Sequence, residues 1–141
     1  MKIFVKKLEP EAKIPSYAHP GDAGMDLYSL ENVNIKPGER VSCRTGIAIQ
    51  IPGGYAGLIW DKSGIAWNGG IKTVAGVIDS GYRGEVGIVL VNLGHKDYKI
   101  NKGDKIAQML IQKVEDPEII EAENLEESAR GNGRFGSTGV S

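Results

Sequence analysis

The stretch GVIDSGYRGE, residues 76–85, comes directly before the most apolar run of the chain, residues 86–91. It places the carboxyl group of Asp79 and the phenol of Tyr82 among three glycines. Glycine permits positive φ angles and a close approach of the backbone to a ligand, so a tight turn can present Asp79 and Tyr82 side by side. A polar loop held by a stiff strand is a common place for a site. The alternative is an ordinary surface turn, in which Asp79 and Ser80 serve turn chemistry.

Length and charge limit the classes of function. A chain of 141 residues is the size of one domain and can bury a core without disulfides or metals. Its 17 basic and 18 acidic side chains leave a net charge of −1, which excludes the general positive field that holds a polyanion such as DNA. We therefore expect no stable nucleic-acid binding, and any phosphate binding must be local.

The cysteine and the histidines do not indicate a metal or redox centre. Cys43 lies in a strand-like pattern and is expected to be a buried structural thiol. His19 and His95 have no partner at ligand spacing and are expected at the surface. No long apolar segment follows the first lysines, so we expect no signal peptide, no membrane span and a cytoplasmic protein.

Glycine and proline punctuate the chain between short apolar runs, which predicts an all-β fold, an antiparallel sandwich or jelly roll. Residues 85–93 are apolar at nearly every position and are expected to form a central strand buried on both faces. Two further strands are expected within residues 33–51, joined by a turn at Pro37 and Gly38, and Gly46 interrupts the second of them. Residues 98–100 are expected to turn back and pair with the central strand. The remaining expected strands are residues 2–8 at an edge, residues 55–60 and residues 105–114.

One short helix is expected near residues 63–68. Ser63 is a good N-cap, and the glycines at 69 and 70 end the helix. The N–H groups at its start, together with the Ser63 hydroxyl and Lys62, can form a compact anion site. The alternative is a capped helix that merely connects two strands.

Two other polar residues lie beside apolar runs. Asp26, in PGDAGMDLYS (residues 20–29), either belongs to a turn that leads into a strand or orients a hydrated metal ion. Gln108, within the last apolar run, is either an edge residue or a ligand contact.

The last two segments differ in composition from the rest. Seven of the 14 residues at 115–128 are Asp or Glu, which is typical of a solvated linker or arm. Residues 129–141, ARGNGRFGSTGVS, contain G-x-G-x-x-G without the strand and helix that a Rossmann fingerprint requires. Their arginines and backbone N–H groups can wrap a polyphosphate as a flexible strap, with Phe135 free to stack on a base. The alternative is a disordered C-terminus.

Five separated stretches agree with one family. They are AGMDLYS (23–29), DKSGIA (61–66), GVIDSGYRGE (76–85), GDKIAQMLI (103–111) and RGNGRFGSTG (130–139). In order and spacing they resemble the five motifs of the trimeric dUTP pyrophosphatases, the dUTPases. The resemblance covers most of the chain. It implies a jelly-roll (distorted β-barrel) homotrimer that hydrolyses dUTP to dUMP and pyrophosphate with Mg²⁺, which keeps uracil out of DNA and supplies dUMP for dTMP synthesis.

The resemblance also implies how the chain is divided. Residues 1–114 would form the catalytic core, residues 115–128 an arm crossing to a neighbouring subunit, and residues 129–141 a strap that closes over the nucleotide. Each of three shared sites would take its first, second and fourth motifs from one subunit, the third motif from a second subunit and the tail from the third.

Roles of single residues follow from the same resemblance. Asp79 would position and activate the attacking water, and Asp26 would hold hydrated Mg²⁺ through its waters. Tyr82 would pack on the deoxyribose and so exclude ribose. The other implied substrate contacts fall into three groups. The backbone of a hairpin around residues 72–78, with Gly76, Val77 and Ile78, would read uracil. Lys62, Ser63, Gly64 and Gln108 would contact phosphates, and the tail would contribute Arg130, Phe135, Gly136, Ser137 and Thr138.

Two positions depart from the family pattern. Lys62 stands where the family usually has arginine, and Arg134 where it usually has glycine; we expect altered affinity rather than lost chemistry. A dCTP deaminase, or a bifunctional dCTP deaminase and dUTPase of the same fold, is an alternative. A non-catalytic trimer that senses deoxynucleotides is another.

Overall fold

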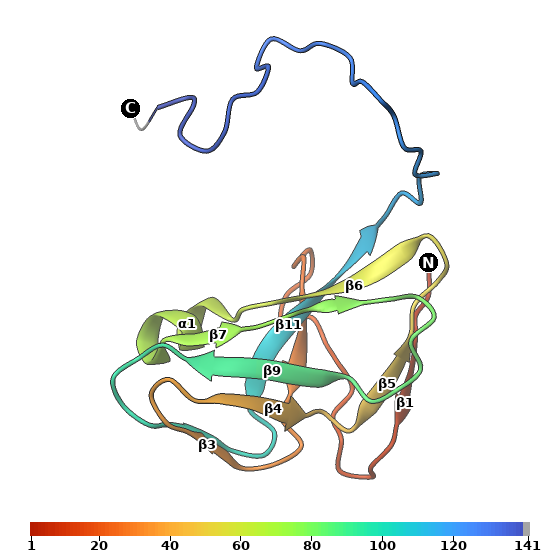
Figure 1. Cartoon of the computed structure of the whole chain (residues 1–141). Coiled ribbons are helices and arrows are strands. Elements are labelled where there is room, and N and C mark those ends of the chain that lie inside the picture. Colours follow the sequence, from red (N-terminus) through yellow and green to blue (C-terminus); the bar gives the residue numbers. More distant parts are fainter. Residues whose placement is uncertain (140–141) are drawn as a thin grey trace.

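The computed structural model describes residues 1–139, and in these residues the chain is built from short strands and one short helix (Figure 1). The strands are β1 (Phe4–Lys7), β2 (Met25–Tyr28), β3 (Val33–Ile35), β4 (Arg40–Arg44), β5 (Ile47–Gln50), β6 (Tyr55–Trp60), β7 (Ile71–Thr73), β8 (Val77–Ile78), β9 (Gly87–Asn92), β10 (Tyr98–Ile100) and β11 (Lys105–Lys113); the helix is α1 (Ser63–Gly69). The all-β prediction is confirmed.

Two larger sheets and two strand pairs make up the core of the molecule. One sheet has the order β2-β11-β6-β8 and the other β4-β9-β7, while β1 pairs with β5 and β10 with β3. Every strand pair is antiparallel. Among the strands of residues 1–139, no two paired strands follow each other directly in the chain, so long-range pairing holds the fold together.

Aliphatic side chains fill the space between the sheets. The largest fully buried ones are Leu27, Ile35, Ile47, Ile49, Ile51, Ile71, Val86, Ile88, Leu90, Ile100, Ile106 and Met109. Cys43 is buried among them, as expected, and its pKa is raised to about 11 by burial and by the charge of Glu31. Strand β9 is central, as predicted, but in one chain Ile88 and Leu90 face the core whereas Val89 and Val91 are half-buried.

Two predicted strand arrangements are wrong. Gly46 adopts φ +71°, which ends a strand rather than interrupting it, so β4 pairs with β9 and β5 turns away to pair with β1. Strand β10 pairs with β3 instead of returning to β9. Asn92 explains this path, because its Nδ2 donates to the carbonyls of both Ile35 and Lys96 at 2.8 Å and so directs the turn after β9 toward β3.

Helix α1 was predicted at the right place with the wrong cap. Lys62 is the N-cap residue and no side chain caps the helix there, so Ser63 is its first residue. The helix ends at Gly69, and the C-cap residue Gly70 is left-handed (φ 69°) and donates its N–H to the carbonyl of Ala66. A Cβ at Gly70 would lie 2.6 Å from the backbone nitrogen of Gly94, so glycine is also required for close packing against the turn after β9.

Beyond β11 the chain leaves the barrel (Figure 1). Residues 114–139 form no helix or strand, and their side chains are exposed. Within residues 114–139, the aliphatic side chains of Ile119, Ile120 and Leu125 are largely exposed. The last two residues of the predicted strap, 140–141, lie outside the described residues. Among those described, no helix is long and apolar enough to cross a membrane.

Candidate active site

Three strands bring motif residues into one row. Asp26 on β2 lies directly opposite Gln108 on β11, and Gln108 lies opposite Trp60 on β6. Side chains at directly opposed positions share a face of the sheet. The segment from Lys62 to Gly64 follows β6 at once, so three of the five predicted motif stretches meet here.

Asp26 is the buried charge of this cluster. Its side chain is only 3% exposed, and Lys62 Nζ donates to Oδ1 at 2.7 Å. Lys105 Nζ lies 2.8 Å from Oδ2, yet among residues 1–139 no group gives that oxygen a well-directed hydrogen bond. Burial raises the pKa of Asp26, but the two ammonium groups outweigh burial and lower its pKa overall.

Two neighbours fix the position of the Gln108 side-chain amide. Its Nε2 donates to the carbonyl of Asp61 at 2.9 Å. A Cβ at Gly24 would lie 2.3 Å from Gln108 Oε1, so glycine at residue 24 makes room for the amide. Gln108 is therefore held beside Asp26 and next to the start of helix α1.

Asp61 was not identified from the sequence as a functional residue. Its Oδ1 accepts hydrogen bonds from the N–H and hydroxyl of Thr73 at 2.6 and 2.7 Å, and Oδ2 pairs with Lys72 Nζ at 2.9 Å. Burial raises the pKa of Asp61, and these hydrogen bonds and the Lys72 charge lower it overall. Asp61 thus ties the segment carrying Lys62 and Ser63 to strand β7. Its position next to Lys62 in DKSGIA was the available signal.

The predicted anion contacts Ser63 and Gly64 are exposed beside this cluster. The first backbone bond of the helix runs from Ala66 N to Lys62 O at 3.0 Å. The N–H groups of Ser63 and Gly64 come before it, where a helix offers no internal acceptor. Two lysines therefore contact the buried Asp26 carboxylate, the Gln108 amide lies opposite it, and the free N–H groups of the helix start follow Lys62 directly.

Several hydrogen bonds hold the loop after β8. The Tyr82 N–H donates to the Asp79 carbonyl at 3.1 Å, and the Tyr82 hydroxyl donates to the Glu85 carbonyl at 2.7 Å. Arg44 clamps the Glu85 carboxylate with Nε at 3.0 Å and Nη2 at 2.8 Å. Asp79 and Tyr82 line one pocket of about 150 Å³ together with Val77, Ile78, Glu85 and Gly87. The sequence prediction that they lie side by side is confirmed.

The glycines of this loop have reasons other than positive φ. None of Gly76, Gly81 and Gly84 is left-handed, whereas Ala75 is, with φ 68°. A Cβ at Gly76 would lie 2.9 Å from the Ile59 carbonyl oxygen. A Cβ at Gly84 would lie 2.6 Å from the Tyr82 hydroxyl. Close packing, rather than turn conformation, requires glycine at these two positions.

Residues 72–78 form a corner between the two sheets. The implied hairpin is wrong, because strand β7 pairs with β9 and strand β8 with β6 rather than with each other. The corner is fixed by bonds from Val74 N to Val89 O at 2.9 Å and from Ile59 N to Gly76 O at 2.7 Å. A second small pocket of about 130 Å³ lies here, lined by Ile59, residues 74–78 and residues 87–89.

The two clusters are far apart within one chain. In the sheet, β8 is the third strand away from β2. Asp79 follows the end of β8 and also lies farther along the strand direction than the row of Asp26, Gln108 and Trp60. At ordinary strand spacing and rise, the backbones of Asp79 and Asp26 are about 20 Å apart. A single chain does not bring these two carboxylates together.

The predicted tail contacts form a third group. Arg130, Phe135, Gly136, Ser137 and Thr138 are all exposed. Among the described residues, the hydrogen bonds of the tail stay within it or reach Ser128: Arg130 Nε donates to Gly133 O at 3.1 Å, and Ser137 N to Arg134 O at 2.9 Å. The structure therefore places the tail contacts on neither cluster.

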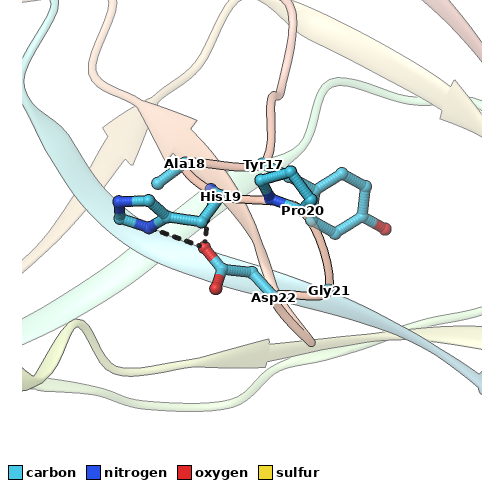
Figure 2. Close-up of a pocket in the computed structure, with 6 residues that line it drawn as sticks. All are labelled: Tyr17, Ala18, His19, Pro20, Gly21 and Asp22. Atoms are coloured by element: carbon cyan, nitrogen blue, oxygen red, sulfur yellow. Dashed lines mark hydrogen bonds and ion pairs between the residues drawn. The ribbon is translucent and has the colours of Figure 1, made fainter.

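A larger hollow of about 380 Å³ is formed by residues 17–22, just before β2 (Figure 2). His19 donates its backbone N–H to Asp22 Oδ2 at 2.9 Å, and its ring Nδ1 lies 3.4 Å from the same oxygen. Figure 2 shows the imidazole and the carboxylate facing each other, with Tyr17 pointing away. None of the predicted site residues lines this hollow.

The chain offers a divalent cation one contact rather than a complete site. Within residues 1–139 no three His, Cys, Asp or Glu side chains gather to hold a metal ion. Mg²⁺ takes six oxygen ligands and usually keeps several waters. The buried Asp26 Oδ2, which lacks a directed hydrogen bond, fits a contact through such a water. The remaining ligands must be waters and oxygens of a bound ligand.

Comparison with known proteins gives the family. A family model described as dUTPase matches residues 10–139. Deoxyuridine 5'-triphosphate nucleotidohydrolases of Clostridium kluyveri and Thermobifida fusca are 48% and 46% identical over 142 residues. Both matches cover 99% of this chain, and they cover 99% and 79% of the two relatives, respectively.

Solved structures agree. A mutant dUTPase of Staphylococcus bacteriophage 80alpha with dUpNHpp matches with a TM-score of 0.93 and 33% identity, covering 99% of each chain. A mutant dUTPase of S. aureus phage phi11, described with a structural Mg(II) ion, matches with a TM-score of 0.84 and 30% identity, covering 90% of this chain and 100% of that one. These matches confirm the jelly-roll prediction, and with the family model and the curated relatives they show that the chain belongs to the dUTPase family.

Proposed function

We propose that this protein hydrolyses dUTP to dUMP and pyrophosphate, as a homotrimer whose active sites combine residues of neighbouring subunits. The reaction is proposed from the similarity to deoxyuridine 5'-triphosphate nucleotidohydrolases. The sharing of sites between subunits is proposed from one structural observation. The charged cluster at Asp26 and the pocket at Asp79 are separated by about 20 Å at ordinary strand geometry. Since a triphosphate and its base must reach both, a second copy of the chain has to supply one of them.

The cluster around Asp26 suits the triphosphate. Lys62 and Lys105 bring two positive charges against one carboxylate, which leaves a local surplus of positive charge. The exposed residues Ser63 and Gly64 add N–H groups that have no acceptor within the helix, and the Gln108 amide lies directly opposite Asp26. Lys62 contacts phosphate as a point charge, where an arginine would form a bidentate pair.

Asp26 would hold hydrated Mg²⁺ through a water at Oδ2, the buried oxygen without a directed hydrogen bond. The chemistry that Mg²⁺ would supply there is neutralisation of negative charge on the phosphates. Lys62 keeps Oδ1 in place from the other side, at 2.7 Å. The carboxylate is therefore oriented before substrate arrives.

Asp79 would be the general base. Its exposed carboxylate lines the pocket with Tyr82 and can accept a proton from a water as that water's oxygen bonds to the α-phosphorus. The bond from the α-phosphorus to the bridging oxygen breaks, and pyrophosphate leaves. The fixed loop supports this role, because the Asp79 carbonyl is bonded to Tyr82 and the loop end is clamped by Arg44.

Tyr82 and the corner at residues 72–78 would select the nucleoside. The Tyr82 ring is held by its bond to Glu85 O, so it can pack on a deoxyribose and exclude a ribose. Backbone groups of Gly76, Val77 and Ile78 would read the uracil edge. A wrong base would leave these polar groups unpaired, which can lower kcat/KM by a factor of about 10⁴.

The arm and the strap would complete the site in trans. Residues 115–128 would carry the tail to a neighbour, where Arg130, Ser137 and Thr138 contact the outer phosphates and Phe135 stacks on uracil. The support is that the tail is exposed and that residues 114–139 leave the barrel (Figure 1). Such an enzyme, placed in the cytoplasm, would keep uracil out of DNA and supply dUMP.

The test is pyrophosphate release from dUTP, dCTP, dTTP and UTP in parallel, with Mg²⁺ and with a chelator. We expect release from dUTP alone, and its loss on chelation. Ammonia release from dCTP would instead indicate the deaminase or the bifunctional enzyme. Tight dUTP binding without turnover would indicate a sensor and direct attention to Lys62 and Arg134.

A further inference from the structure

Lys105 reaches Asp26 because of an irregularity in strand pairing. In a regular strand, Lys105 and Gln108 are three residues apart and would point to opposite faces. The register between β11 and β2 shifts by one residue between Lys105 and Ala107, so Lys105 lies opposite Tyr28 and Gln108 opposite Asp26. Tyr28 and Asp26 are two residues apart and share a face. The bulge therefore turns Lys105 onto the face that carries Asp26.

The two lysines contact Asp26 unequally. Lys62 donates a directed hydrogen bond to Oδ1 and its side chain is 28% exposed. Lys105 is close to Oδ2 without a directed bond, and its side chain is 48% exposed. Because its side chain is the more exposed of the two, Lys105 can leave Asp26 more easily than Lys62 can.

A cation and the Lys105 ammonium compete for the same oxygen. With Lys105 beside Oδ2, a hydrated divalent ion would become the third cation around one carboxylate, and like charges repel strongly near a protein surface. A triphosphate removes this conflict, because its oxygens offer the ammonium a new partner while they ligate the ion.

We propose that Lys105 is a displaceable counter-ion of Asp26: it occupies Oδ2 in the nucleotide-free protein and moves to the triphosphate when the metal-nucleotide complex binds. Lys105 is thus a positioning residue that makes the site accept the complex as a unit and disfavour the bare cation. This inference rests on the proposed function for the identity of the nucleotide.

The test is Mn²⁺ binding to the full chain without nucleotide, followed by electron paramagnetic resonance. We expect Lys105→Met to bind Mn²⁺ about tenfold tighter than wild type, the effect of removing one near-surface charge interaction. Adding Asp26→Asn to this variant should abolish the gain. With dUpNHpp present the order should reverse, because the variant lacks a phosphate contact.

Two variants serve as controls. Lys105→Arg keeps the charge and should leave Mn²⁺ binding as weak as in wild type. Lys102→Met removes a lysine of similar exposure that pairs with Glu11 away from the cluster, and it should change nothing. Equal Mn²⁺ affinity in wild type and Lys105→Met, or a gain that survives Asp26→Asn, would overturn the proposal. Since Mn²⁺ is measured without nucleotide, failure here is distinct from a failure to turn over dUTP.

Discussion

Gln108 lies opposite Asp26 across the β2 and β11 pair, and a Cβ on the neighbouring Gly24 would overlap its amide oxygen at 2.3 Å. The absence of a side chain at residue 24 therefore decides where the Gln108 amide sits. This relationship links the first and fourth motif stretches through packing.

Gly24→Ala should displace Gln108 and weaken dUpNHpp binding by at least about tenfold, the loss of one hydrogen bond to a charged group. The melting temperature should change little, because the end of a flexible side chain can move aside. Calorimetry measures the affinity. Gly53→Ala, at a turn where a Cβ meets nothing within 4 Å, is the matched control. An unchanged affinity in Gly24→Ala would show that Gln108 does not contact the ligand.

The sequence predicted strand positions well because glycine and proline mark local turns. Residues 55–60 were predicted as a strand and form β6. Partners were harder to predict, because a bend at Gly46 and the bonds of Asn92 redirect strands by long-range contacts. Pairing of this kind has no local signature in one sequence.

The same difference between local and long-range contacts decided which site contacts could be predicted. Asp79 and Tyr82 could be predicted to lie close together because they are three positions apart in one loop. The contact of Lys105 with Asp26 was not predicted, since it depends on a one-residue shift between two strands. Asp61 was missed because its partners Lys72 and Thr73 lie 11 and 12 residues away on β7.

Asp79→Asn should leave dUpNHpp binding nearly intact and lower kcat by at least about 100-fold, the usual scale for a positioned general base. The amide keeps the size of the side chain but accepts no proton at neutral pH. Steady-state pyrophosphate release measures kcat. Asp97→Asn, at an exposed aspartate bonded to Asn34 Nδ2 at 3.0 Å, controls for the chemical change. A kcat near wild type would remove Asp79 from the mechanism.

Deleting residues 129–141 should leave a folded protein with turnover reduced at least about 100-fold, the scale for lost positioning of substrate. The described part of this segment is exposed, and its hydrogen bonds remain local, so the barrel loses no support. Urea unfolding and pyrophosphate release are measured together. If the truncated chain unfolds at lower urea, the segment is structural.

The lowered pKa of Asp61 should make the free energy of unfolding depend on pH. Burial raises its pKa, but the Thr73 and Lys72 interactions lower it overall, below the ordinary value of 3.8. A folded-state pKa below the unfolded one stabilises the protein above the unfolded value, and this stabilisation is lost as pH falls through the folded pKa. The free energy of unfolding of Asp61→Asn should therefore lie furthest below wild type at pH 7 and approach it toward pH 3. A deficit independent of pH would show that packing, not charge, is lost.

Mixed oligomers test the separation of Asp26 and Asp79. If a site takes these carboxylates from different subunits, two inactive variants, Asp26→Asn and Asp79→Asn, should restore activity when co-expressed. Random mixing would give about one quarter of the sites both native carboxylates, and activity should approach that share of wild type. Asp26→Asn mixed with Gln108→Ala should restore little, because these residues face each other within one chain. Activity no greater than the sum of the two parents in the first mixture would show that each chain builds its own site, despite the distance between its clusters.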